Sequence, residues 1–260
     1  YGDFDYADKW VSAALSGTMM TFTSGKHGPN NFHTLGGDAR KEAAQKGTAY
    51  MNVWMYVVRE FEDAIDDCNT CVRTDTENNC NEHSTSTVSV HAWDEGVAFY
   101  TGSLEGTAHG GSTAGKLLYR LAEKRCANFG TCGASGTGAT GTSQVNTELF
   151  ALFANGRDWL QQGRCSSVRP LVNQIVSLMT VPLVQGSLRY AYKNSAAGGM
   201  ASAKNAAEGA TFSAAVLPLV HHCSPEAAAT ISDNLKFGLF PDGVAVEAAR
   251  YSDAGAVKSA

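Results

Sequence analysis

Two acidic segments contain most of the side chains in this sequence that could bind a metal ion. The first carries five carboxylates within residues 60–67, and the second places His91 one helical turn before Asp94 and Glu95. Carboxylate and imidazole ligands suit iron, manganese and zinc, whereas sets made only of oxygen ligands suit calcium and magnesium. The residue types therefore predict a cation site in which both segments take part. The predicted ligands are Glu60, Asp63, Asp67, His91, Asp94 and Glu95, with Tyr56, Glu62, Tyr100 and Glu105 as further candidates.

The first acidic segment ends a long predicted helix, residues 38–67. Apolar residues of this helix, among them Val57, Phe61 and Ile65, recur at helical spacing. Carboxylates at the carboxyl end of a helix oppose the helix dipole, at a cost of roughly 0.3–1 kcal/mol each. The run therefore either has a compensating cation or forms an ordinary solvated face, and the sequence leaves both interpretations open.

The second segment lies on a predicted helix, residues 87–101, that is apolar around most of its circumference. Such a helix is expected to be buried. Asp94 and Glu95 would then be buried charges, which are costly unless they are paired or bind a metal ion. The two interpretations of this helix are a metal or ligand site and an ion pair of Asp94 with Arg59 or Arg120.

A metal-dependent enzyme is the less favoured interpretation. Helical bundles build di-iron sites from two Glu-x-x-His pairs, and these two helices offer only His91. Residues 110–116 fit the phosphate-binding pattern G-x-x-x-x-G-K, but Leu117 stands where that motif needs Ser or Thr. No catalytic residue is predicted, and a simple binding site is expected rather than an enzyme.

The composition describes a chain with a substantial core and few charges. Hydrophobic residues make up 43% of the 260 residues, charged residues make up 17%, and the net charge is -5. Without a basic patch, a nucleic-acid partner is not expected. No apolar run approaches the roughly 20 residues of a membrane span. The low charge and the first residue, Tyr1, favour a processed, secreted protein.

Seven cysteines predict a set of disulfides, which form in oxidising compartments. The predicted pairs are Cys71–Cys80, Cys126–Cys132 and Cys165–Cys223. Because seven is an odd number, one thiol is free or its partner lies in a removed segment. The alternative is a small zinc site made by Cys68, Cys71, Cys80 and His83.

The predicted fold is all-α, a disulfide-stapled helical bundle, because no segment shows the alternating apolar residues of a strand. Besides the two helices above, helices are expected at residues 7–15, 112–126, 143–162, 167–192, 201–221, 225–237 and 244–251. Residues 94–99 resemble residues 207–212, which suggests two duplicated helical halves. The predicted divisions are an N-terminal arm with a short helix (1–37), a first half carrying the acidic site (38–165) and a second half (166–260). A single compact domain is the alternative.

Residues 57–68, followed by residues 93–106, resemble the secreted iron-assimilation proteins of green algae, also known as high-CO2-inducible periplasmic proteins. The resemblance extends over residues 38–132 and more loosely beyond. It implies an extracellular protein that assists iron uptake without a known catalytic reaction, with a Glu-x-x-Glu pair as iron ligands. Glu60-x-x-Asp63 matches that pair with Asp in place of one Glu. A more distant likeness to imelysin-type helical proteins rests on His91-x-x-Asp94, where that family has His-x-x-Glu.

We therefore expect an extracellular protein that binds iron and concentrates or delivers it near the cell surface, in the periplasmic space or cell wall. Ionised carboxylates and neutral His91 would hold ferrous or ferric iron, or another divalent cation, and Tyr56 or Tyr100 would join them if the iron is ferric. Binding should weaken as the pH falls and the ligands take up protons. The expected partners are the metal ion and a cell-surface iron transporter or reductase. The alternatives are a structural wall protein without metal and a carboxylate-bridged di-metal enzyme.

Overall fold

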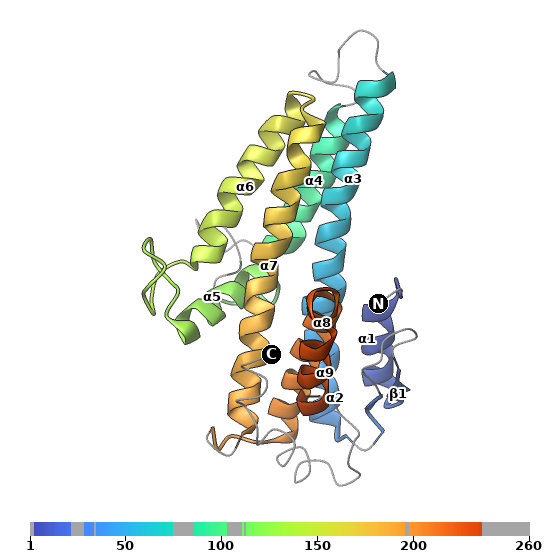
Figure 1. Ribbon diagram of the computed structural model, residues 1–260, viewed down its shortest axis with the longest axis vertical. Coiled ribbons are helices and arrows are strands. Elements are labelled where there is room, and N and C mark those ends of the chain that lie inside the picture. Colours follow the sequence, from blue (N-terminus) through green and yellow to red (C-terminus); the bar gives the residue numbers. More distant parts are fainter. Residues whose placement is uncertain are drawn as a thin grey trace. The chain divides into compact units, whose positions relative to one another are not determined.

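The computed structural model describes residues 3–21, 29–33, 35–74, 86–102, 111, 113–195 and 198–235. Nearly all regular structure in this part of the chain is helical (Figure 1), which confirms the predicted all-α class. The exception is a pair of two-residue strands, β1 (Met19–Met20) and β2 (Asn30–Asn31), which pair antiparallel. Strands this short show no alternating pattern, so the sequence could not predict them.

Contacts divide the chain into two compact units, residues 1–52 with 183–260 and residues 53–182. These units do not coincide with the predicted divisions at residues 37 and 165, because the first unit combines the beginning and the end of the chain. One boundary falls between the consecutive segments η1 and α3, and the other falls inside α7, directly after Pro182.

The first unit is made of short helices and one end of a long helix. They are α1 (Tyr6–Ser16), α2 (Gly37–Gly47), the π-helical segment η1 (Thr48–Asn52), α8 (Ala203–Cys223), α9 (Pro225–Leu235) and the last part of α7 (Cys165–Asn194). Aromatic rings organise its core. Phe212 stacks against Tyr50 and Tyr190, with ring centroids 5.1 and 5.6 Å apart. Trp10 meets the ring of Phe32 edge-on at 5.1 Å.

The second unit contains longer helices and a second aromatic core. It consists of α3 (Val53–Thr74), α4 (Ser86–Thr101), α5 (Leu118–Phe129), α6 (Gln144–Gln161) and the first part of α7, and α3 and α4 lie side by side (Figure 1). Phe61 of α3 packs against Trp93 of α4 at 4.5 Å and against Phe153 of α6 at 5.6 Å. The indole of Trp93 donates a hydrogen bond of 3.0 Å to the main-chain oxygen of Phe153. These contacts fix which sides of α3 and α4 face solvent.

The predicted helices within the described residues are present, but some of them begin or end at other residues than predicted. The predicted helix 38–67 is three consecutive segments, α2, η1 and α3, and α3 continues to Thr74. The helix predicted to begin at residue 112 begins at Leu118 instead, after the glycine-containing stretch that precedes it. The helix predicted at 244–251 lies outside the described residues.

By length and composition alone, helix α7 is long and apolar enough to span a membrane. No charged residue lies between Arg169 and Arg189, which makes this stretch strongly apolar. In the most apolar window, 44% of the residues are buried within the protein. The core helix of a soluble protein passes the same test, so the helix by itself is weak support for a membrane span.

The cysteines confirm the disulfide prediction in part. Cys126 bonds to Cys132 as predicted, and Cys71 is also in a disulfide, although its predicted partner Cys80 lies outside the described residues. The predicted pair Cys165–Cys223 is wrong, because Cys165 bonds to Cys68 and Cys223 is free and exposed. The Cys68–Cys165 disulfide joins α3 to the start of α7 inside the second unit.

The same disulfides exclude the zinc alternative. Zinc is held by cysteine thiolates, and Cys68 and Cys71 have no thiolate to offer because both are disulfide-bonded. His83 and Cys80 lie outside the described residues.

Candidate functional site

Three side chains of the predicted metal site share one face of α3. Tyr56, Glu60 and Asp63 are separated by four and three residues, a spacing that brings them onto the same side of a helix. Glu95 of α4 lies close enough for its charge to act on the Tyr56 hydroxyl. We call Tyr56, Glu60, Asp63 and Glu95 the acidic corner of the second unit.

The acidic corner lies at the surface of the protein. The ring of Tyr56 meets the ring of Phe99 edge-on, with centroids 4.7 Å apart and planes at 77°. These two rings are 42% and 40% exposed, so water reaches the phenol from one side. Glu60 lies below them and is buried, whereas Glu95 is exposed. A cation could therefore approach from solvent and meet both phenol and carboxylate oxygens.

The carboxylates raise the pKa of the Tyr56 hydroxyl above its ordinary value of 10.0. The largest cause is the hydrogen bond that the hydroxyl donates to Glu60, followed by the negative charge of Glu60, burial, and the charges of Glu95 and Asp63. Each of these negative charges disfavours a phenolate. The same local potential favours the approach of a cation.

Arginines already compensate part of the acidic run on α3. The guanidinium of Arg59 lies 2.6 Å from a carboxylate oxygen of Asp63, and that of Arg169 lies 2.5 Å from Glu62. The hydrogen bond to Glu62 is the largest cause that raises the pKa of Arg169. Asp67 lies one turn beyond Asp63, and partial burial, followed by the charges of Asp63 and Asp66, raises its pKa.

The expected burial of the second acidic segment is wrong. His91, Asp94 and Glu95 are all exposed. The buried side of α4 is formed by Ser89, Trp93, Gly96 and Tyr100, at spacings of four, three and four residues. Val88 and Phe99, which made the helix look apolar on both sides, point to solvent. The charges on α4 therefore need no partner to be tolerated.

Among the described residues, no group of three or more His, Cys, Asp or Glu side chains is arranged to hold a metal ion. Of the predicted ligands, only Glu105 lies outside the described residues. Tyr100 is buried in the core, where its hydroxyl donates to Asn146 at 2.5 Å, and burial raises its pKa well above the ordinary value. The charges of Glu60, Asp63 and Glu95 act on the Tyr56 hydroxyl, but these side chains are not arranged as a ligand set. His91 and Asp94 are exposed on α4, and Tyr100 is buried in the core.

A second charged cluster lies in the first unit, and sequence reasoning did not find it. Glu208 of α8 is only 7% exposed. Tyr190 of α7 and Glu42 of α2 lie close enough to this carboxyl to affect its pKa through hydrogen bonding. The Lys46 ammonium lies 3.5 Å from Glu42, and that of Lys204 lies 3.8 Å from it. We call Glu42 and Glu208 the carboxyl pair.

Burial dominates the electrostatics of this second cluster. Burial, as the largest cause, raises the pKa of Glu208 above its ordinary value of 4.5. The hydrogen bond from Tyr190 and the charge of Lys46 act in the opposite direction, and Glu42 adds to the rise. The pKa of Lys46 is also raised: burial lowers it, but Tyr50, Glu208 and Glu42 together outweigh burial. One signal could have found the cluster, since Glu208 is the sole charge in the small and apolar run 206–217.

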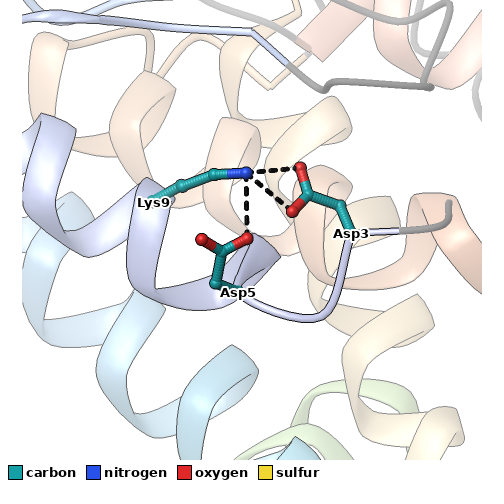
Figure 2. Close-up of polar contacts among 3 residues, drawn as sticks. All are labelled: Asp3, Asp5 and Lys9. Atoms are coloured by element: carbon teal, nitrogen blue, oxygen red, sulfur yellow. Dashed lines mark hydrogen bonds and ion pairs between the residues drawn. The ribbon is translucent and has the colours of Figure 1, made fainter.

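A third polar feature lies at the beginning of the chain. The ammonium of Lys9 is held between Asp3 and Asp5, at 2.7 and 2.9 Å (Figure 2). The hydrogen bonds to Asp3 and Asp5 raise the pKa of Lys9. An open pocket of about 360 Å³ beside this lysine is lined by Ser12, Ser16 and Thr18. Because the two aspartates neutralise Lys9, the pocket has no strong attraction for an anion.

The fold and the cysteines define an all-α, disulfide-stapled helical protein. Disulfides of this kind form and persist in oxidising compartments. Comparisons of the chain with protein-family models, with curated proteins and with solved structures found no match.

Proposed function

We propose that this chain is an extracellular iron-binding protein, without enzymatic activity, that concentrates or delivers iron near the cell surface. The acidic corner carries this proposal, because the charges of three carboxylates from two helices act on one phenol at the protein surface. Phenol and carboxylate oxygens are hard ligands, which iron accepts readily in its ferric form. The resemblance to algal iron-assimilation proteins supports iron as the cation.

Binding at the acidic corner needs a rearrangement of its side chains. Asp63 pairs with Arg59, whose side chain is 67% exposed and free to turn into solvent. Exposed ion pairs of this kind contribute only about 0.2–1 kcal/mol, so an incoming cation can displace the arginine. The Tyr56 hydroxyl must also lose its proton before it can bind as phenolate, and its raised pKa opposes that step until the metal charge is present. The carboxylates would therefore capture the ion and the phenolate would complete the site.

Equilibrium dialysis tests the proposal directly. Wild-type protein is dialysed near neutral pH against ferrous iron under anaerobic conditions and against ferric nitrilotriacetate, and bound metal is measured by mass spectrometry. We expect uptake by the wild type and a loss of at least about tenfold in affinity for Glu60→Gln/Glu95→Gln, equivalent to about 1.4 kcal/mol.

Glu148→Gln/Asp158→Asn is the matched control. It removes two exposed carboxylates from α6 of the same unit and changes the net charge equally. We expect this control to bind iron as the wild type does. No uptake of either form of iron by the wild type, or equal losses in both double variants, would reject the acidic corner as an iron site.

A structural wall protein without metal is the second candidate. The pairs Arg59–Asp63 and Arg169–Glu62 favour it, because they show that part of the acidic run has cationic partners within the protein. Metal analysis of protein from its native source separates the candidates. Iron in the purified protein supports the binding function, in which the iron is passed to a cell-surface transporter or reductase. Absence of iron supports the structural role. Two metal ions per chain would indicate a di-metal enzyme.

A further inference from the structure

Glu208 is a charged residue on a helix face that is otherwise small and apolar. Every residue from Ala206 to Ala214 on α8 is buried. The side chain of Glu208 nevertheless has polar partners on two other helices, Glu42 of α2 and Tyr190 of α7. A buried carboxylate is costly unless it is hydrogen-bonded or paired, so the geometry of these partners decides which ionisation state the fold favours.

A hydrogen bond between Glu42 and Glu208 would require a proton. An ionised carboxylate can only accept hydrogen bonds, whereas a protonated one can also donate. A hydrogen bond between two carboxyl groups therefore forms only when one of them is protonated. When both are ionised, two negative charges face each other in a partly buried place, and each disfavours the ionisation of the other.

The charged and titratable groups around Glu208 come from several elements. Helix α2 contributes Glu42 and Lys46, and α7 contributes Tyr190. From η1, Tyr50 acts on Lys46, and on α8 itself Lys204 lies 3.8 Å from Glu42. On α9, which also packs against α8, Glu226 and Asp233 are exposed. Lys46 and Lys204 therefore offset part of the repulsion within the carboxyl pair, while burial acts against both charges.

We propose that the carboxyl pair is a pH-sensitive fastening between α2 and α8, which is tight when Glu42 and Glu208 share a proton and looser when both are ionised. The raised pKa of Glu208 determines how the stability of this contact changes with pH. The folded state binds the proton more tightly than the unfolded chain, so the extra stability is fully present below the ordinary glutamate pKa of 4.5 and is lost as the pH rises through the raised pKa. The first unit is thus fastened most tightly under mildly acidic conditions.

Nuclear magnetic resonance of protein labelled with ¹³C at the glutamate side-chain carboxyls tests the fastening in the wild-type protein. Glu42→Gln and Glu208→Gln assign the two resonances. We expect the Glu208 carboxyl to titrate over a pH interval that lies above the titration of exposed glutamates, and the Glu42 resonance to respond to the same proton. If Glu208 titrates with the exposed glutamates, the pair shares no proton and the proposal is overturned.

Hydrogen exchange then tests whether protonation affects the helices. Protection of α2 and α8 is measured by mass spectrometry between pH 4.5 and 8 and corrected for the pH dependence of intrinsic exchange. We expect protection in the wild type to fall severalfold as the pH rises, and Glu208→Gln, which cannot ionise, to keep it nearly constant. Asp233→Asn, which removes an exposed carboxylate from the same unit, should behave as the wild type. A wild-type protein whose α2 and α8 exchange equally at both ends of the range would refute the fastening.

Discussion

The acidic corner and the carboxyl pair differ in the number of their charges and in their access to water. The corner belongs to a surface that carries many acids, and its member Asp63 and the adjacent Glu62 already pair with arginines. Each region has one buried acid, Glu60 at 8% and Glu208 at 7% exposed. The regions differ in the acids around it. Asp63 and Glu95 of the corner are open to water, which screens their charges, whereas the Glu42 side chain is only 15% exposed.

Each region also contains a glutamate followed by a glycine that packs against an aromatic residue of a neighbouring helix. Gly96 follows Glu95 and packs against Phe61, and Gly209 follows Glu208 and packs against Tyr190. The local sequence is therefore alike, whereas one glutamate is exposed and the other is buried. The chemistry of an acidic side chain therefore depends on whether neighbouring helices cover the side of the helix on which it lies.

Replacing the basic side chain beside each region should give the largest difference in stability between the two regions. Lys46→Met leaves the carboxyl pair without its nearest positive charge, whereas Arg59→Met removes the exposed partner of a partly buried aspartate. We expect the first change to lower the free energy of unfolding by about 1–3 kcal/mol at neutral pH and the second by less than about 1 kcal/mol. Urea unfolding followed by circular dichroism measures both. Equal losses would show that burial does not distinguish the two regions.

Alanine substitutions at the two glycines compare how tightly the two regions are packed. A methyl group on Gly96 would lie 2.8 Å from the buried ring of Phe61, so Gly96→Ala should cost about 1–3 kcal/mol. At Gly209 the nearest atoms are 3.3–3.4 Å away, and Gly209→Ala should lie within about 1 kcal/mol of the wild type because alanine also favours the helix. Urea denaturation with one fluorescence probe compares the two variants. A larger loss at Gly209 than at Gly96 would contradict the packing described for α8.

The helical fold was predictable because its signals are local. The periodic apolar residues Phe61 and Ile65 are buried as the spacing predicts. The start of α9 is also confirmed, since the Ala227 amide donates to the side chain of Ser224, just before Pro225. Spacing along one helix and chemistry at one helix end do not depend on the rest of the fold.

The candidate site was only half predictable, because exposure is decided by distant segments. The sequence identifies Glu60 and Asp63 as neighbours at helical spacing, but it cannot tell that α3 and α6 cover the opposite side of α4 and leave Glu95 in water. The same limit explains the disulfides. The local loop Cys126–Cys132 was predictable, whereas the bond between Cys68 and Cys165, 97 residues apart, depends on the packing of α3 and α7.

Arg59 provides a smaller test, which concerns the acidic corner alone. If the corner binds iron, Arg59 competes with the metal for Asp63. Arg59→Gln should therefore raise iron affinity by about 1.4- to fivefold, as expected from the roughly 0.2–1 kcal/mol of an exposed ion pair. Arg157→Gln, whose arginine pairs with Asp158 on α6 of the same unit, is the control for the change in net charge. Tighter binding by both variants would indicate general attraction to an acidic surface, and weaker binding by Arg59→Gln would remove Asp63 from the ligand set.

The smallest expected effect is on the Tyr56 hydroxyl, and it bears most directly on how the corner works. Glu60 is the largest cause of the raised pKa of Tyr56, through the hydrogen bond it accepts and through its charge. Glu60→Gln should therefore lower the pKa of Tyr56 toward 10.0, whereas Glu148→Gln on α6 should leave it unchanged. The chain has nine tyrosines, so the titration is best followed by ¹³C resonances of labelled tyrosine rings, with Tyr56 assigned by Tyr56→Phe. A Tyr56 pKa that is the same with and without Glu60 would mean that the phenol and the carboxylate do not share a site. The two side chains would then have no common potential with which to attract a cation.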